Sequence, residues 1–199
     1  MRRGLPYTAA ALTLWLWGCS FGPAAAQQTG LAAAAWTGAG LDGHLDALGR
    51  EVTGVPVMTG AELSYHLALP ADFTGGLGLG GMYVRREGSL GEERFTAEAL
   101  RFTVAPELGY RATEQLRFRA GVEIRSAADL AAFDTRFADN VRAHVRLAGD
   151  LRLNGCLAVT AAVSRLVGDA GDIGNLVDPG RSLRLGLRHR FALDTDRGR

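Results

Sequence analysis

The sequence predicts an all-β protein, a closed antiparallel up-and-down transmembrane β-barrel of about eight strands. Apolar and polar residues alternate with a period of two along most of the chain, and long and short connections alternate between the periodic segments. The polar positions also carry many charges. So much charge would be hard to bury in a water-soluble barrel, whereas in a membrane barrel the polar sides face inward and the apolar sides face lipid.

Eight segments carry the alternation, and each is close to or above the roughly 9–11 residues that a tilted membrane strand needs. They are Ala35–Leu48, Val57–Leu69, Phe73–Arg85, Phe95–Arg111, Gln115–Arg125, Asn140–Leu151, Cys156–Val167 and Ser182–Leu193. The last segment shows the pattern most clearly. One of its sides holds Leu183, Leu185, Leu187 and Phe191, and the other holds Arg184, Gly186, Arg188 and Arg190.

The connections support the same fold. Short ones are predicted at Pro70–Asp72, Ala112–Glu114 and Arg152–Gly155, and longer ones at Gly49–Pro56, Arg86–Arg94, Ser126–Asp139 and Gly168–Arg181. Outer-membrane barrels of this topology have short periplasmic turns and longer outer loops. The glycine-rich segment Phe73–Arg85 suits a bend or a position that faces bulky arginines in the lumen.

Length and composition indicate one exported domain. The chain has 199 residues and a net charge of +1, which argues against a nucleic-acid partner. Arg2, Arg3, a short apolar run and Ala24–Ala26 predict a cleaved signal peptide over residues 1–26, followed by a barrel domain over 27–199. An alternative signal would leave a lipid on Cys19. No later stretch has the roughly 18 apolar residues of a membrane helix.

The charged side chains that face the predicted lumen are the candidate site. Asp42, His44 and Asp46 fall on the inward side of the first predicted strand, and barrel closure puts this strand beside the last one. We therefore expect them to pair with the arginines of the last strand, in a network that either fills the lumen or gates a narrow path. The predicted network comprises Asp42, His44, Asp46, Glu62, Arg117, Arg119, Glu123, Arg142, Arg146, Arg184, Arg188 and Arg190.

The sequence predicts no enzyme, cofactor or metal centre. Ser64, His66 and Glu62 share one strand face, but side chains two residues apart on a strand seldom form a nucleophile–base hydrogen bond. The four histidines are dispersed along the chain. Asp169, Asp172 and Asp178 lie on one predicted loop without the spacing of a calcium loop.

These features resemble small outer-membrane β-barrels of the OmpA/OmpX type. Arg184, Gly186 and Phe191 resemble the C-terminal signal that the barrel-insertion machinery recognises, although His189 and the eight-residue tail depart from it. Arg165–Ala170, Asp172, Leu176-Val177 and the last strand resemble the MipA/OmpV family, although Ile173-Gly174 replaces its usual Ser-Pro. That second resemblance implies scaffolding of murein-processing enzymes.

We therefore expect a non-enzymatic protein of the Gram-negative outer membrane, with a structural, envelope-integrity or scaffolding role. Its expected partners are outer-membrane lipid, the barrel-insertion machinery and, from the second resemblance, murein-processing enzymes. One alternative is a narrow porin-like channel for ions or small solutes. Another is a soluble periplasmic barrel that binds a small apolar ligand.

Overall fold

A computed structural model describes residues 29–47, 50–168 and 176–191. The predicted signal peptide, Cys19, Asp169 and Asp172 lie outside these residues. Within the described ranges twelve strands form a single sheet. Their bounds are β1 Gly30–Gly40, β2 His44–Ala47, β3 Arg50–Thr53, β4 Val57–Ala68, β5 Phe73–Leu90, β6 Glu93–Arg111, β7 Leu116–Arg125, β8 Asp129–Ala132, β9 Thr135–Ala138, β10 Arg142–Arg152, β11 Leu157–Leu166 and β12 Arg181–Arg190.

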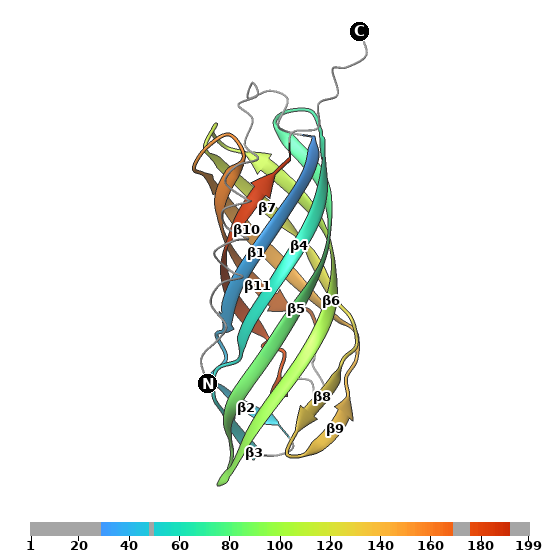
Figure 1. Cartoon of the computed structure of the whole chain (residues 1–199), viewed down its shortest axis with the longest axis vertical. Helices are drawn as coiled ribbons and strands as arrows, with labels where there is room; N and C mark the ends of the chain where they lie inside the picture. The colour runs from blue at the N-terminus through green and yellow to red at the C-terminus, as the bar shows by residue number, and fades with distance from the viewer. Residues whose placement is uncertain (1–28, 48–49, 169–175, 192–199) are drawn as a thin grey trace, which may run out of the picture.

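Eight of these strands close a barrel (Figure 1). Their order around the ring is β1, β4, β5, β6, β7, β10, β11, β12, and β12 pairs antiparallel with β1, so Trp36 lies opposite Gly186. Closure gives every strand of the ring two neighbours and leaves no open sheet edge within the wall. The predicted fold, a closed antiparallel transmembrane β-barrel of about eight strands, is confirmed.

The two ends of the barrel differ. At the end that we call the turn end, residues 69–72, 112–115 and 153–156 connect neighbouring strands, as the three predicted short connections require. At the opposite end, which we call the hairpin end, β2 pairs with β3, β8 pairs with β9, and β5 and β6 extend to a turn at residues 91–92 (Figure 1).

Three sequence predictions are wrong in this region. The first barrel strand is Gly30–Gly40 rather than Ala35–Leu48, because residues 44–53 form the separate β2–β3 hairpin. The predicted loop Arg86–Arg94 is mostly strand, with only residues 91–92 between β5 and β6. The predicted loop Ser126–Asp139 contains the β8–β9 hairpin, whose turn residues Phe133 and Asp134 both have positive φ.

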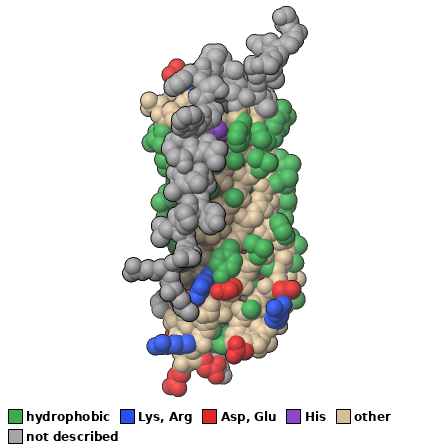
Figure 2. All heavy atoms as spheres, viewed as in Figure 1, with side chains coloured by type: hydrophobic (Ala, Val, Ile, Leu, Met, Phe, Trp, Pro, Cys, Tyr) green, Lys and Arg blue, Asp and Glu red, His purple; other side chains and the backbone are tan. Residues whose placement is uncertain are grey.

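The outer wall is apolar over much of its height. Large exposed side chains such as Leu100 (64 %), Phe102 (70 %) and Leu185 (54 %) point away from the interior. Figure 2 shows apolar side chains over the wall, and charged ones gathered at the hairpin end. A surface with this much exposed apolar area is stable in lipid and unfavourable in water.

Near the hairpin end, the apolar residues of the wall change from outward to inward positions, and we call this change the exchange of faces. Along β5, the outward positions change from Leu79 to Glu87 while the inward positions change from Gly78 to Val84. The partner strand β6 changes at the same height, since Val84 pairs with Ala99. Beyond this height the outer face is polar and the interior is mostly apolar, as in a water-soluble protein, with the buried Arg86 as an exception.

The interior consequently has two layers. The apolar layer, at the hairpin end, comprises Val52, Met58, Met82, Val84, Leu90, Phe95, Ala97, Ala99, Ala128, Leu130, Ala132, Leu176 and Val177. The charged layer, between the apolar layer and the turn end, comprises Glu62, Glu107, Arg119, Glu123, Arg146, Asp150, Arg184 and Arg188.

Candidate functional site

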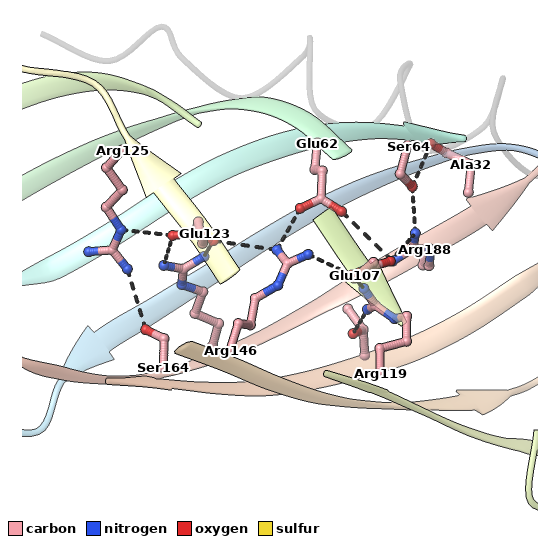
Figure 3. Close-up of polar contacts among 12 residues, drawn as sticks. Ala32, Glu62, Ser64, Glu107, Arg119, Glu123, Arg125, Arg146, Ser164 and Arg188 are labelled. Carbon is pink, nitrogen blue, oxygen red and sulfur yellow. Dashed lines mark hydrogen bonds and ion pairs between the residues drawn. The ribbon is translucent and has the colours of Figure 1, made fainter. Parts of the chain in front are cut away.

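Glu123 on β7 is the first centre of the charged layer (Figure 3). Its carboxylate accepts hydrogen bonds from Arg184 at 2.6 and 2.7 Å, from Arg125 at 2.7 Å and from Arg146 at 3.4 Å. The Glu123 side chain is 1 % exposed, and its three partners are also buried. A buried carboxylate that is surrounded by guanidinium groups has its desolvation offset by several charge-assisted hydrogen bonds.

Glu62 and Glu107 form a second centre with Arg146 between them (Figure 3). Arg146 donates to Glu62 at 2.6 Å and to Glu107 at 2.7 Å, and Arg119 donates to Glu107 at 2.7 Å. β4 and β10 lie on opposite sides of the ring of eight, so the Glu62–Arg146 pair crosses the lumen. Arg188 on β12 also faces β6 across the ring, with its Nη2 atom 3.6 Å from Glu107.

Asp150 completes the layer towards the turn end. Arg119 binds both of its carboxylate oxygens, at 3.0 and 2.9 Å. A fork of this kind fixes both side chains more tightly than a single contact does. Arg190 lies farther from Asp150, at 3.8 Å.

A second set of buried charges lies nearer the hairpin end. Asp178, in the connection between β11 and β12, pairs with Arg125 and lies 3.5 Å from His144. Burial alone would raise the pKa of Asp178, but Arg125, His144 and Arg101 together outweigh burial and hold that pKa below its ordinary value. Arg101 and Arg142 share Asp139. The end of this long connection is therefore held inside the barrel by charge as well as by Leu176.

Glycines make room for the inward side chains. On β5, Gly78 pairs with Ser64, and a Cβ atom at Gly78 would lie 2.9 Å from the Glu62 carboxyl carbon. The inward glycines of β5 face bulky side chains, as predicted, but at Gly76 and Gly78 these are His66 and Glu62 rather than arginines. Trp36 has similar neighbours, because it pairs with Gly60 on one side and Gly186 on the other.

Trp36 faces the lumen rather than the lipid. Its ring lies 4.3 Å from the guanidinium carbon of Arg184, within the range of a cation–π contact. A tryptophan in a membrane barrel is commonly expected at the lipid–water interface, but the inward register of β1 decides otherwise.

The structure corrects the sequence argument about Ser64 and His66. His66 Nε2 lies 3.1 Å from Ser64 Oγ, although the two residues are only two apart on one strand. Arg188 Nη2 donates to the same His66 nitrogen at 2.6 Å, and that nitrogen is 3.6 Å from Glu107. A catalytic triad would place the acid on the other ring nitrogen. Ser64, Arg188 and Glu107 all lie around the same His66 nitrogen, so the cluster is buried and polar but does not have the arrangement of a triad.

The structure places the predicted site residues unevenly. Glu62, Arg119, Glu123, Arg146, Arg184 and Arg188 lie together in the charged layer, and Arg142 lies with Asp139 nearer the hairpin end. Arg117 and Arg190 face inward near the turn end. Gly186 faces inward beside Trp36, whereas Phe191 follows β12 and is 41 % exposed.

The predicted position of Asp42, His44 and Asp46 is wrong. Asp42 follows β1 and accepts a hydrogen bond from Arg181 at 3.0 Å, instead of pairing with the inward arginines of β12. His44 and Asp46 belong to the β2 strand of the hairpin. The first barrel strand ends at Gly40, so none of these three residues is on its inward face.

The sequence argument missed Glu107, Asp150 and Asp178 as members of the network. Glu107 and Asp150 lie on the polar faces of their strands, so the alternation of the sequence could have identified them as inward residues. Asp178 gave no such signal, because it lies in a connection. Among the described residues no group of three or more acidic, histidine or cysteine side chains could hold a metal ion, and no helix there is long and apolar enough to span a membrane.

No family model matches the chain, and no curated protein matches it. Among solved structures, the chain is similar to Ail, the attachment invasion locus protein of Yersinia pestis, at 12 % identity and a TM-score of 0.47, over 83 % of this chain and 99 % of Ail. It is also similar to a de novo designed transmembrane β-barrel, at 13 % identity and a TM-score of 0.39, over 82 % of this chain and 96 % of the design.

A third similar structure is the translocator domain of the autotransporter NalP from Neisseria meningitidis. The identity is 13 % and the TM-score 0.32, over 93 % of this chain and 95 % of that domain. The fold assignment rests on this chain's own strand pairing and apolar outer wall. On both grounds the chain is a small transmembrane β-barrel with a charged interior.

Proposed function

We propose that this protein is a non-enzymatic barrel of the Gram-negative outer membrane whose interior is closed, and that it has a structural role in the cell envelope. The outer location is supported by the apolar wall and by closure of the sheet, which together suit a lipid bilayer. The predicted export signal supports the same compartment.

The observation that carries this proposal is the bonding across the lumen. Arg146 on β10 reaches Glu62 on β4, and Arg184 on β12 reaches Glu123 on β7, so charged side chains bridge strands that are not neighbours. An eight-stranded barrel has room for little more than its own side chains. Leu176 and Val177, both 0 % exposed, fill the interior with apolar side chains on the hairpin side of these bridges.

The non-enzymatic part of the proposal is supported by the surroundings of Ser64 and His66. Both side chains are buried, and neither lines the cleft between the 112–115 and 153–156 turns or the cavity beside Trp36. Scaffolding of murein-processing enzymes is the more specific form of the envelope role. It is motivated by the resemblance of Arg165–Ala170 and of the last strand to the MipA/OmpV family. The other proposed partners are outer-membrane lipid and the barrel-insertion machinery.

Planar-bilayer recording tests the closed interior. The barrel is first expressed in a Gram-negative host, and a mobility shift on heating in SDS shows that it is membrane-bound and folded. We then expect no discrete conductance steps from the wild type. Steps that change on Arg188→Ala would instead make the protein a narrow channel. Release by osmotic shock, with no need for detergent, would favour the soluble ligand-binding alternative.

Envelope function is tested in the cells that make the protein. Removing its gene should increase sensitivity to detergent with EDTA, and wild-type protein should restore resistance. Glu123→Ala protein that still shows the heat-dependent band shift serves as a comparison, because it changes the interior and leaves the outer wall intact. Unchanged sensitivity after gene removal would contradict an integrity role. Cross-linking in the same cells should recover murein-processing enzymes if the barrel scaffolds them.

A further inference from the structure

The turn end contains a cleft lined by arginines that the charged layer does not use. It lies between the 112–115 and 153–156 turns and encloses about 340 Å³, including space open to solvent. Its charged lining residues are Arg111, Glu114, Arg117, Asp150, Arg152 and Arg190. They come from four strands or adjoining turns that the barrel brings together.

Arg117 is the unusual member of this lining. Its side chain is inward on β7, and the residue is only 5 % exposed. Among the described residues it forms neither a side-chain hydrogen bond nor an ion pair, although Asp150 stands opposite it on β10. Asp150 is committed to Arg119 through two hydrogen bonds. The Arg117 nitrogens are not enclosed by the protein, so the guanidinium opens onto the cleft and can bind an external anion there.

Two further arginines beside Arg117 give the cleft an excess of positive charge. Arg152 also forms no ion pair within the described part of the chain, and the nearest carboxylate to Arg190 is Asp150 at 3.8 Å. Arg190 lies within electrostatic reach of both Arg117 and Arg152. The remaining acid, Glu114, lies on an exposed turn. Besides Arg111, which pairs with Asp72, the cleft therefore gathers three guanidinium groups around one carboxylate that already has a partner.

We propose that this cleft binds a phosphate group through Arg117, Arg152 and Arg190. Guanidinium groups bind phosphate oxygens through paired hydrogen bonds, and a phosphate carries up to two negative charges, which suits a surplus of this size better than one carboxylate does. The phosphate is either free in solution or part of a phospholipid headgroup in the leaflet next to the turn end. The proposal does not depend on the closed lumen.

Titration calorimetry tests the site on the folded barrel in an uncharged, phosphate-free detergent, with inorganic phosphate as the probe. We expect saturable binding to the wild type, and affinity at least about tenfold weaker in Arg117→Gln, because a charge-assisted contact is lost. Arg136→Gln, on the exposed β9 strand at the other end, is the matched control and should bind as the wild type does. The heat-dependent band shift confirms folding of each variant.

A second arm distinguishes the source of the phosphate. The wild type and both variants are reconstituted in phosphatidylglycerol nanodiscs, extracted into the same detergent, and assayed for retained lipid phosphorus. More phosphorus on the wild type than on Arg117→Gln, without saturable inorganic phosphate binding, assigns the site to a headgroup. Saturable inorganic phosphate binding that Arg117→Gln weakens assigns it to free phosphate. Equal results for the wild type and Arg117→Gln in both arms would overturn the proposal.

Discussion

The charged layer and the apolar layer lie inside the same barrel, yet they are held together by opposite means. In the charged layer, Glu123 and Glu62 accept hydrogen bonds from arginines on distant strands. In the apolar layer, Leu130 and Val84 are buried without polar partners. The wall outside the charged layer is apolar, whereas the wall along the apolar layer changes from the apolar Leu100 to the exposed Glu98 and Glu87. The medium outside the wall therefore determines what the inside must be.

The comparison shows how one strand can serve two environments. Along β6, Leu108 and Val104 point outward near the charged-layer residue Glu107, while Glu98 points outward at the height of the apolar layer. The period of two never breaks, but the apolar residues change from one parity to the other. We infer that the exchange marks the height at which the barrel leaves the bilayer on the hairpin side.

The largest expected effect comes from removing the centre of the charged layer. Glu123→Ala leaves Arg125, Arg146 and Arg184 without their shared carboxylate. Breaking a buried pair in this way costs about 3–5 kcal/mol in the free energy of unfolding. Urea unfolding of the folded barrel in detergent measures the loss. As a control, Glu98→Ala removes an exposed acid and should cost less than about 1 kcal/mol. Equal losses for the two variants would contradict the assigned role of the layer.

The next effect tests the apolar layer. Leu130→Ala creates a cavity under the β8–β9 hairpin, which should cost about 2–5 kcal/mol in the stability of that region. Because the hairpin is attached at the end of the barrel, limited proteolysis between Asp129 and Ala138 should become faster while the heat-dependent band shift persists. Loss of the band shift would show instead that the two layers unfold together.

A charge on the outer wall tests where the exchange of faces lies. Leu79→Arg puts a guanidinium on the apolar outer surface of β5 and should destabilise the barrel in lipid by about 2–4 kcal/mol. Thr96→Arg makes the corresponding change on β6 beyond the exchange, opposite Glu87, and should cost about 0–1 kcal/mol. Unfolding in lipid vesicles compares the two variants, and similar costs would move the inferred boundary.

The smallest effect concerns the space around the charged layer. Gly78→Val places a side chain against the Glu62 carboxyl group, and should destabilise the barrel by about 1–3 kcal/mol through overpacking. Gly75→Val on the same strand has more room, since the nearest atom to a Cβ there is a Leu69 methyl at 3.6 Å. A smaller loss for Gly75→Val in the urea experiment supports this explanation of the glycines.

Local sequence predicts a barrel strand well where its two faces contrast. The last strand alternates leucine with arginine, and its observed bounds, Arg181–Arg190, differ little from the predicted Ser182–Leu193. The first strand fails because its inward residues include Ala32 and Ala34, which give almost no contrast with the outward alanines. The alternation of polar and apolar residues is stronger from Asp42 onward, so the predicted strand wrongly included residues of the β2–β3 hairpin.

The sequence by itself determined the class of fold, an approximate number of strands, and the side chains available to line the interior, because a period of two and turn composition act over a few residues. The tertiary structure decided which charges meet. Arg146 reaches Glu62 across 84 positions of the chain, and Ser64 meets Arg188 through closure of the barrel. Such pairings depend on strand register and on the diameter of the ring, which arise only when all eight strands close together.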